Sequence, residues 1–373
     1  MTKPYDLTET GELALGGIPA IELAQQFGTP LYVYDVSRIR QAIRQFKQVF
    51  EETGVKSVVS YASKAFSAIA MYEVAAQEGA HLDVVSGGEI YTALQANFPM
   101  ADISFNGSNK SEAELTLALD SHVGTIIVDN FYELQLLETL LMERQQKQNI
   151  LLRITPGISA HTHEFISTGQ NDSKFGFDVT SGQAQKALNL ALASDWFNVL
   201  GISAHIGSQI FEVTGFVAAA EKLMDLVHEW GYQPEVINVG GGFGIRYTDE
   251  DKPLPASDYL KAIIAAVKAK ATAYATELPA IWIEPGRSIV GEAGTSLYTV
   301  GSRKDVPGIR SYLAVDGGMG DNIRPALYEA NYQALLATQP EATKEEVVRI
   351  AGKYCESGDV LVWQESLPAT KPG

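Results

Sequence analysis

A lysine, a histidine and a carboxylate–arginine motif stand where they could carry out chemistry. Lys64 closes the apolar, strand-like run "VVSYASKA" at residues 58–65, His205 lies in "AHIGSQI", and "EPGR" holds Glu284 and Arg287. An amine at the rim of an apolar strand is either a solvated charge or, once neighbours desolvate it, a nucleophile. The lysine therefore raises the question of a covalent catalyst.

Three consecutive glycines form a second chemical feature, in "NVGGGFG" at residues 238–244. Gly240, Gly241 and Gly242 would let backbone N–H groups close on an anion such as phosphate. The run does not match the dinucleotide pattern G-x-G-x-x-G, because Ile245 occupies the last position, and it lacks the Gly-Lys-Ser/Thr of a P-loop. A tight turn without a ligand is the alternative.

Eight strand-like runs, each followed by a helix-like stretch, organise the region that contains these residues. They span residues 58–64, 81–86, 103–108, 125–130, 150–156, 199–208, 236–243 and 281–290. This alternation predicts an α/β protein built on a (β/α)₈ TIM barrel, with a doubly wound open sheet as the alternative.

Polar side chains recur at the ends of these runs. In chain order they are Lys64, Asp83, Ser86, Asn106, Asp129, Asn130, Arg153, His205, Ser208, Glu284 and Arg287, with the glycine run after the seventh strand. A TIM barrel carries its active site at the carboxyl ends of its strands, and the loops after strands 7 and 8 commonly hold phosphate. We expect all these groups at one end of the barrel, with Ser208 adding a hydroxyl near the glycines.

A strand-end lysine beside a phosphate cradle suggests pyridoxal 5'-phosphate bound to Lys64 as a Schiff base. Glu284 would then face the pyridine nitrogen and keep it protonated, and His205 could stack on the ring. Each residue also has an ordinary structural explanation. Lys64 could be solvated, His205 could be a satisfied core histidine, and Glu284 could pair with Arg287.

Beyond Val290 the sequence reads as strands without long helices, in "TSLYTVGSRK", "RSYLAVDGGM" and "EVVRIAGKYCESGDVLVW". The first 30 or so residues carry short strand-like pieces as well. We therefore predict a barrel domain at residues 35–290, and a β-rich domain made of residues 1–34 and 291–373.

Charge and cysteine content restrict the partners and the compartment. The 373 residues include 28 basic and 45 acidic side chains, for a net charge of −17, which disfavours nucleic acid and anionic membranes as partners. A single cysteine, Cys355, fits a reducing compartment. The acidic N-terminal stretch does not resemble a signal peptide, and no apolar run approaches the roughly 18 residues of a membrane span. We expect a cytoplasmic protein.

Six motifs together resemble a known enzyme family. "YASKA", "HIGSQI", "GGGFGI" and "EPGRSIV" are similar to the fold-type III, alanine-racemase-like pyridoxal phosphate decarboxylases, including the ornithine and arginine enzymes. "GGMGDNIRPALY" and "KYCESGD" resemble the diaminopimelate decarboxylases more narrowly. The resemblance covers nearly the whole chain and implies a barrel plus a β domain, with active sites shared across a homodimer.

The resemblance also implies roles for individual residues. It gives Lys64, His205 and Cys355 as catalytic, with Cys355 protonating the substrate carbon after CO₂ leaves. Residues implied or expected at the cofactor are Lys64, Asp83, Arg153, His205, Ser208, Gly240, Gly241, Gly242, Glu284, Gly286 and Arg287. Arg287, Arg324 and Tyr328 would hold the distal carboxylate of an amino-acid substrate, and Glu356 its distal ammonium.

The implied reaction converts meso-2,6-diaminopimelate to L-lysine and CO₂. A substrate with a second amino-acid end needs a planar cation for its carboxylate, so Arg324 argues against a diamine-forming enzyme. A decarboxylase of another amino acid is one alternative. A cofactor-binding pseudoenzyme is another, because family chains usually extend further past "CESGD", so the β domain is expected to lack its last strands.

"HTHEF" contains the histidines of a possible metal pair, His161 and His163. The sequence offers no convincing third ligand, so we expect no metal site.

Overall fold

The computed structural model describes residues 5–158 and 172–373. The chain divides into two compact units, and neither is continuous in sequence. The larger unit comprises Ile39–Ile245 and Pro253–Gly291, and the smaller comprises Met1–Arg38, Arg246–Lys252 and Glu292–Gly373.

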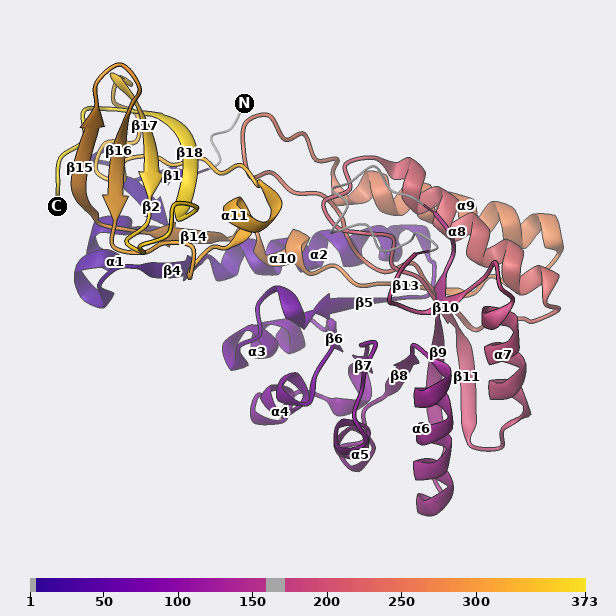
Figure 1. Ribbon diagram of the computed structural model, residues 1–373. Helices are drawn as coiled ribbons and strands as arrows, with labels where there is room; N and C mark the ends of the chain where they lie inside the picture. The colour runs from indigo at the N-terminus through magenta and orange to yellow at the C-terminus, as the bar shows by residue number, and fades with distance from the viewer. Residues whose placement is uncertain (1–4, 159–171) are drawn as a thin grey trace. The chain divides into compact units, whose positions relative to one another are not determined.

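The larger unit is built on a closed barrel of eight parallel strands (Figure 1). The strands are β5 (Ser57–Ala62), β6 (His81–Val84), β7 (Ile103–Phe105), β8 (Thr125–Val128), β9 (Gln148–Thr155), β11 (Phe197–Ser203), β12 (Val236–Asn238) and β13 (Ala280–Ile283). β13 pairs with β5, for example at Trp282 and Val58, and this pairing closes the barrel. The prediction of a (β/α)₈ barrel is confirmed.

Burial on both faces explains the nearly unbroken apolar character of these strands. All four residues of β8 are buried, and Ile127 packs with Leu151 of β9, Leu200 of β11 and Val236 of β12. A parallel sheet covered on one face by helices and filled inside by side chains needs apolar residues at successive positions.

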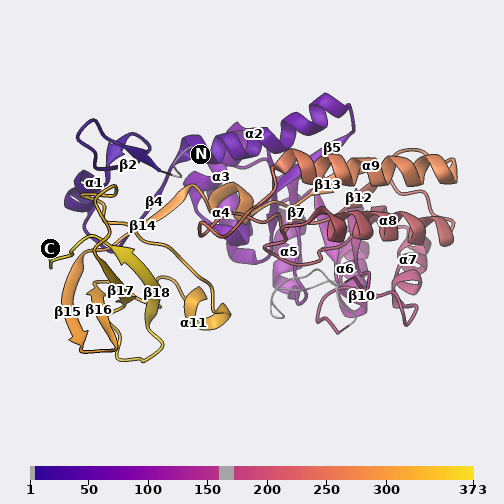
Figure 2. The ribbon, with the colours of Figure 1, turned by 90° about the horizontal axis from the view of Figure 1, so that it is seen from above.

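Helices follow the strands around the outside of the barrel. They are α3 (Ile69–Gln77), α4 (Gly87–Gln95), α5 (Glu112–Asp120), α6 (Phe131–Arg144), α7 (Gln183–Ala193), α8 (Val213–Glu229) and α9 (Ala256–Tyr274), while α2 (Val36–Thr53) precedes β5. α8 and α9 lie side by side (Figure 2), where Tyr274 and Lys270 both reach the carboxylate of Asp225 at 2.6 Å. Among the described residues, no helix has the length and apolar character needed to cross a bilayer.

Several strands are shorter than the sequence predicts. The runs predicted at 199–208, 236–243 and 281–290 end as strands at Ser203, Asn238 and Ile283. Lys64 lies in the short 3₁₀ helix η1 (Ser63–Ala65), just beyond β5. Most of the candidate residues therefore stand on loops that leave the barrel, whereas Asp83 and Arg153 lie on the strands β6 and β9 themselves.

The smaller unit is mainly β structure and includes the N-terminal segment. Its strands are β1 (Asp6–Leu7), β2 (Leu13–Leu15), β3 (Ile18–Pro19), β4 (Leu31–Tyr34), β14 (Gly294–Leu297), β15 (Val300–Val306), β16 (Arg310–Val315), β17 (Glu346–Ala351) and β18 (Val360–Leu367). It also holds the helices α1 (Ala20–Phe27) and α11 (Arg324–Tyr328).

Long-range pairing holds the smaller unit together. β4 pairs with β14 in antiparallel register from Leu31–Leu297 to Tyr34–Gly294. β15 to β18 form one four-stranded sheet, whose buried side chains include Leu313, Val348 and Val362. The predicted β domain that takes in N-terminal residues is confirmed as a fold class.

Candidate active site

Two carboxyl groups and two amides form a buried network at the carboxyl ends of four barrel strands. Asn106, after β7, donates through Nδ2 to Asp83 Oδ1 on β6 at 2.6 Å and to Glu284 Oε1 after β13 at 3.2 Å. Asn238, at the end of β12, donates to the same Glu284 oxygen at 2.7 Å. We call Asp83, Asn106, Asn238 and Glu284 the carboxyl–amide network. It fixes Glu284 from two sides.

The two carboxyl groups of this network differ in their surroundings. Asp83 is almost fully buried, and burial together with the neighbouring Glu284 charge raises the pKa of Asp83 well above its usual range. The charge of Lys64 opposes this rise, so the lysine lies close enough to act on Asp83. Lys64 itself is exposed. An exposed amine thus stands near a buried carboxyl group whose pKa is raised.

His205 follows β11 and faces the same end of the barrel. Burial lowers the pKa of His205 well below its usual range, and the nearby charges of Lys64 and Arg153 lower it further. Its Nδ1 accepts a hydrogen bond from the backbone N–H of Gly241 at 3.3 Å. The ring is therefore neutral, with its proton on Nε2.

Close backbone packing explains the three glycines. A Cβ on Gly241 would lie 2.0 Å from the carbonyl oxygen of Glu284, and one on Gly242 would lie 2.1 Å from that of Gly207. Gly240 also has φ +73°, and its N–H donates to Asn238 Oδ1 at 2.9 Å. Only glycine fits where three strand-end loops approach this closely.

An aromatic cluster anchors the glycine loop from behind. Phe243, the next residue, stacks on Phe216 of α8 with ring centroids 4.9 Å apart, and it also contacts Phe46 of α2 at 5.2 Å and Tyr259 of α9 at 5.5 Å. Phe243 is buried. The loop is therefore held by packed side chains as well as by its own hydrogen bonds.

Hydroxyl and guanidinium groups flank the glycine loop. Arg287, the first residue of α10 (Arg287–Val290), donates through Nε and Nη2 to Ser208 Oγ at 3.3 and 3.2 Å. The neighbouring Ser288 has a buried Oγ with no hydrogen-bond partner among the described residues. A Cβ on Gly286 would lie 2.9 Å from Ala62 Cβ at the end of β5. This corner offers polar groups suited to an anion.

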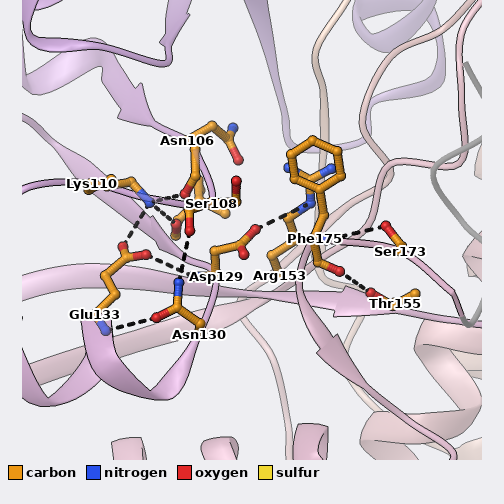
Figure 3. A network of polar contacts seen from close by, with 12 residues as sticks. Asn106, Ser108, Lys110, Asp129, Asn130, Glu133, Arg153, Thr155, Ser173 and Phe175 are labelled. Atoms are coloured by element: carbon orange, nitrogen blue, oxygen red, sulfur yellow. Dashed lines mark hydrogen bonds and ion pairs between the residues drawn. The ribbon is translucent and has the colours of Figure 1, made fainter. Parts of the chain in front are cut away.

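A second polar cluster lies beside the first, at the ends of β7, β8 and β9 (Figure 3). Arg153 of β9 lies with its Nε 3.9 Å from Asp129 Oδ1, and its guanidinium covers the ring of Phe175 at 4.3 Å. Lys110 and Glu133 form an ion pair of 2.7 Å, with both side chains 1% exposed. The predicted residue Arg153 is thus linked to Asp129, also predicted at a strand end, and lies near the Lys110–Glu133 pair, which the sequence did not single out.

Comparison with known proteins decides the family. Residues 36–291 match the model for "Pyridoxal-dependent decarboxylase, pyridoxal binding domain". The chain is 60% identical to the diaminopimelate decarboxylase of Bacillus methanolicus, over 97% of this chain and 85% of that one. It is 55% identical to the enzyme of Bacillus subtilis, over 97% and 84%. The chain belongs to the diaminopimelate decarboxylase family.

Solved structures agree with this assignment to the diaminopimelate decarboxylases. The enzyme from m. jannaschii in co-complex with L-lysine has a TM-score of 0.92 at 36% identity, covering 100% of this chain and 87% of that chain. The enzyme from Helicobacter pylori complexed with L-lysine has a TM-score of 0.85 at 32% identity, covering 95% and 86%. The predicted family is confirmed, and with it a pyridoxal-dependent carboxy-lyase.

The cofactor of this family, pyridoxal 5'-phosphate, matches the chemistry of the barrel site. The exposed amine of Lys64 suits its aldehyde, and the carboxyl–amide network suits its ring nitrogen. Glycine backbone, the Ser208 hydroxyl and the unpartnered Ser288 Oγ suit its phosphate. The residues present therefore fit the group.

Arg324, predicted at the substrate, lies in the smaller unit between two tyrosines. Its Nη1 donates to the hydroxyl of Tyr332 at 2.6 Å, and its guanidinium carbon lies 4.5 Å from the Tyr247 ring centroid. Its Nε is buried and has no hydrogen-bond partner among the described residues. Tyr328 closes the same helix, α11. The two tyrosines restrain the guanidinium plane, and the Nε of Arg324 remains available to a ligand.

Cys355 and Glu356 lie in a turn of the smaller unit that a buried aspartate organises. Both are exposed, and Glu356 Oε1 accepts from Gly358 N at 3.3 Å. Asp359 accepts from Tyr354 N at 2.7 Å and from Met319 N at 2.6 Å. It thereby joins the "GGMGDNIRPALY" and "KYCESGD" motifs, which lie far apart in the sequence.

Sequence reasoning missed several of these supporting residues. Asn238 stands directly before the glycine run and so carried a positional signal, whereas Asn106 was already among the polar residues predicted at the strand ends, without a role of its own. Asp359, Tyr247 and Tyr332 carried none, because their partners are distant in sequence. His161 and His163 lie outside the described residues, among which no group of three or more potential metal ligands occurs.

Proposed function

We propose that this chain decarboxylates meso-2,6-diaminopimelate at its D-centre and releases L-lysine and CO₂. The observation that carries the proposal is the 60% identity over 97% of the chain to a diaminopimelate decarboxylase. The strand-end site supports it, because an exposed amine, paired carboxyl groups and a glycine cradle converge at one end of the barrel. A related decarboxylase of another amino acid is the second candidate.

When bound, pyridoxal phosphate supplies an electron-accepting ring for the electrons of the broken C–CO₂ bond. Lys64 would hold the cofactor covalently through its amine. Glu284, fixed by Asn106 and Asn238, would keep the ring nitrogen protonated, with Asp83, whose pKa is raised by burial, beside it. The neutral ring of His205 would pack against the cofactor. Lys64 and Cys355 would carry out the proton transfers.

The phosphate would be held by the corner of glycines and hydroxyls. Gly240, Gly241, Gly242 and Gly286 allow close approach, and Ser208 and Arg287 add a hydroxyl and a charge. Arg153 would complete the cofactor site through its charge, which acts on both Glu284 and Asp83.

Recognition of the substrate's second end would fall to Arg324, Tyr328, Arg287 and Glu356. Arg324 is prepared for a carboxylate, since Tyr332 and Tyr247 restrain its guanidinium. Glu356 is an exposed carboxylate suited to an ammonium group. Cys355 would deliver the proton that replaces CO₂ on the substrate carbon.

The assembly and compartment are also proposals. We propose a homodimer with shared sites, in which residues 35–290 bind the cofactor and the β-rich residues 1–34 and 291–373 contribute Cys355 and Glu356 to the partner's site. A single cysteine in the chain supports a reducing, cytoplasmic setting.

The decisive experiment measures CO₂ release from meso-diaminopimelate by the purified chain with added pyridoxal phosphate. Lys64→Ala should abolish covalent cofactor uptake and nearly all turnover, because the amine is the anchor. Lys56→Ala is the matched control: it removes an exposed lysine just before the same strand, β5, and should change neither. Full turnover by Lys64→Ala, or none by the unmutated chain loaded with cofactor, would contradict the proposal.

The choice of substrate is tested separately, by kinetics on meso-diaminopimelate. Arg324→Lys should raise KM about tenfold to a hundredfold, the equivalent of one charge-assisted hydrogen bond, because a point charge cannot replace a planar fork. Glu356→Gln should also raise KM. Arg310→Lys, the same exchange at an exposed position of this unit, serves as the control. Unchanged kinetics in both site variants would favour a different substrate.

A further inference from the structure

The buried Lys110–Glu133 ion pair has no part in the proposed reaction, yet it stands beside the cofactor site. Lys110 Nζ donates to Glu133 Oε1 at 2.7 Å and to the carbonyl oxygens of Ile127 and Gly107 at 2.7 and 2.8 Å. All three protons of the ammonium are thus used. The pair ties the end of β7 to the end of β8.

The same pair fixes the backbone of Asp129. Glu133 Oε2 accepts from Asp129 N at 3.2 Å, and Asn130 caps α6 by accepting from Glu133 N at 3.0 Å. Asn130 also donates to the carbonyl oxygen of Ser108 at 3.1 Å. The backbone of Asp129 is consequently held by Glu133 and by the fixed neighbour Asn130.

The side chain of Asp129 points from this cluster toward Arg153, as Figure 3 shows. Asp129 is 2% exposed, and its Oδ1 has no hydrogen-bond partner among the described residues but lies 3.9 Å from Arg153 Nε. Burial raises the pKa of Asp129, and the Arg153 charge is the largest effect that opposes the rise. A buried carboxylate in this position is stabilised chiefly by that guanidinium.

Arg153 in turn acts on the carboxyl groups of the cofactor site. Burial lowers the pKa of Arg153, and the charges of Asp129, Glu284 and Asp83 oppose this in that order. Phe175 covers its guanidinium on one side at 4.3 Å. Asp129 and Phe175 together therefore restrict where the positive charge can sit.

We infer that Asp129 is a positioning residue for Arg153: the Lys110–Glu133 pair fixes Asp129, and Asp129 holds the guanidinium beside Asp83 and Glu284. This inference rests on the proposed function only in taking those two carboxyl groups as the cofactor site. Asp129 is not expected to touch cofactor or substrate, and its effect passes through Arg153.

The test is a double-mutant cycle on the full-length chain, read out by pyridoxal phosphate binding and by the induced circular dichroism of the bound cofactor. Asp129→Asn keeps the shape and removes the charge, and Arg153→Gln removes the guanidinium. Each should raise the Kd for pyridoxal phosphate about tenfold, as expected for one lost charge-assisted contact. The double variant should equal Arg153→Gln within about twofold, because Asp129 then has nothing to hold.

The induced dichroism separates positioning from a merely structural role. Asp129→Asn should alter the dichroic band as Arg153→Gln does, since the band depends on how the cofactor is oriented. Glu78→Gln is the control: it removes another largely buried, arginine-paired acid, from the residue after α3, and should change neither Kd nor band. Asp129→Ser gives the same comparison if the asparagine variant does not fold.

Three results would overturn the inference. They are a Kd for Asp129→Asn within about twofold of the unmutated chain, effects of Asp129→Asn and Arg153→Gln that simply add, and unfolding of both Asp129 variants while Glu78→Gln folds. If the unmutated chain itself took up no pyridoxal phosphate, the proposed function would fail instead, and the two failures are thus distinguishable.

Discussion

Asp83 and Glu284 share one donor, the amide of Asn106, and differ in what else surrounds them. Glu284 has a second amide donor in Asn238, whereas Asp83 is buried beside a like charge. Two carboxyl groups in different environments can take different roles. Here burial and the neighbouring Glu284 charge raise the pKa of Asp83, whereas two amide donors hold the Glu284 carboxyl group in place.

The burial of His205 predicts how the stability of the folded chain changes with pH. Because burial lowers the pKa of His205, the folded chain resists the proton that an unfolded chain accepts below about pH 6.5. Its contribution to stability is therefore complete above that pH and is lost as the pH falls toward the folded pKa. The loss is at most about 1.4 kcal/mol per pH unit.

His205→Gln removes this contribution, so the variant should lose less stability than the unmutated chain between pH 7 and pH 5. Urea unfolding of the cofactor-free chain at several pH values measures the difference. His122→Asn, at an exposed histidine, serves as the control. An identical pH slope for His205→Gln and the unmutated chain would show that the imidazole is protonated as easily when folded.

At the scale of elements, the Lys110–Glu133 ion pair connects the ends of β7 and β8. Removing only one of its charges would leave the other buried without a partner. Burial lowers the pKa of Lys110 and raises that of Glu133, and each charge opposes the shift of the other. Lys110→Met leaves Glu133 buried without its cation and should lower the free energy of unfolding by about 3–5 kcal/mol.

The double variant Lys110→Met/Glu133→Leu removes both charges and should recover most of that loss, since an apolar pair of similar volume is often neutral. Urea unfolding of the single and double variants provides the measurement, with the exposed Lys268→Met on α9 as control. A double variant as unstable as the single one would mean that the ion pair contributes stability beyond compensating its own buried charges.

The order and number of the barrel strands could be predicted from sequence, but their ends could not. Apolar runs mark strands that are buried on both faces, as β8 shows. The end of a strand depends instead on its neighbour: β12 stops at Asn238 because the glycine loop turns toward the Glu284 and Gly207 carbonyls. Such approaches exist only once the barrel has closed.

The candidate site, too, could be predicted only in part from the sequence. Lys64, Asp83, His205 and Glu284 could be predicted because each lies near the end of a recognisable strand or just after it. The contacts that hold them could not, since Asn106 and Glu284 are 178 residues apart and meet only through the β13–β5 pairing. The contact between Tyr247 and Arg324 could not be predicted either, because Tyr247 lies in a seven-residue segment between β12 and α9, far from Arg324 in the sequence.

For the whole molecule, the proposed dimer predicts complementation between two inactive chains. Lys64→Ala and Cys355→Ala are mixed under conditions that allow subunits to exchange. If Cys355 serves the partner's site, one site of each mixed dimer carries both defects and the other carries neither. Random exchange should then restore up to about one quarter of the active sites.

CO₂ release after mixing, with exchange verified by differently tagged chains, is the measurement. Two differently tagged Lys64→Ala chains mixed with each other should stay inactive and serve as the control. Confirmed exchange without returning activity, in the presence of an active unmutated chain, would place Cys355 in the site of its own subunit.

The pairing of β4 with β14 sets a delay during synthesis on the ribosome. Their nearest paired residues, Tyr34 and Gly294, are 260 positions apart, so the intervening barrel sequence must be made first. At a typical elongation rate this takes on the order of 10–50 s. Through that interval Leu31–Tyr34 is an unpaired strand edge on the nascent chain, and holding such edges apart is a task for chaperones.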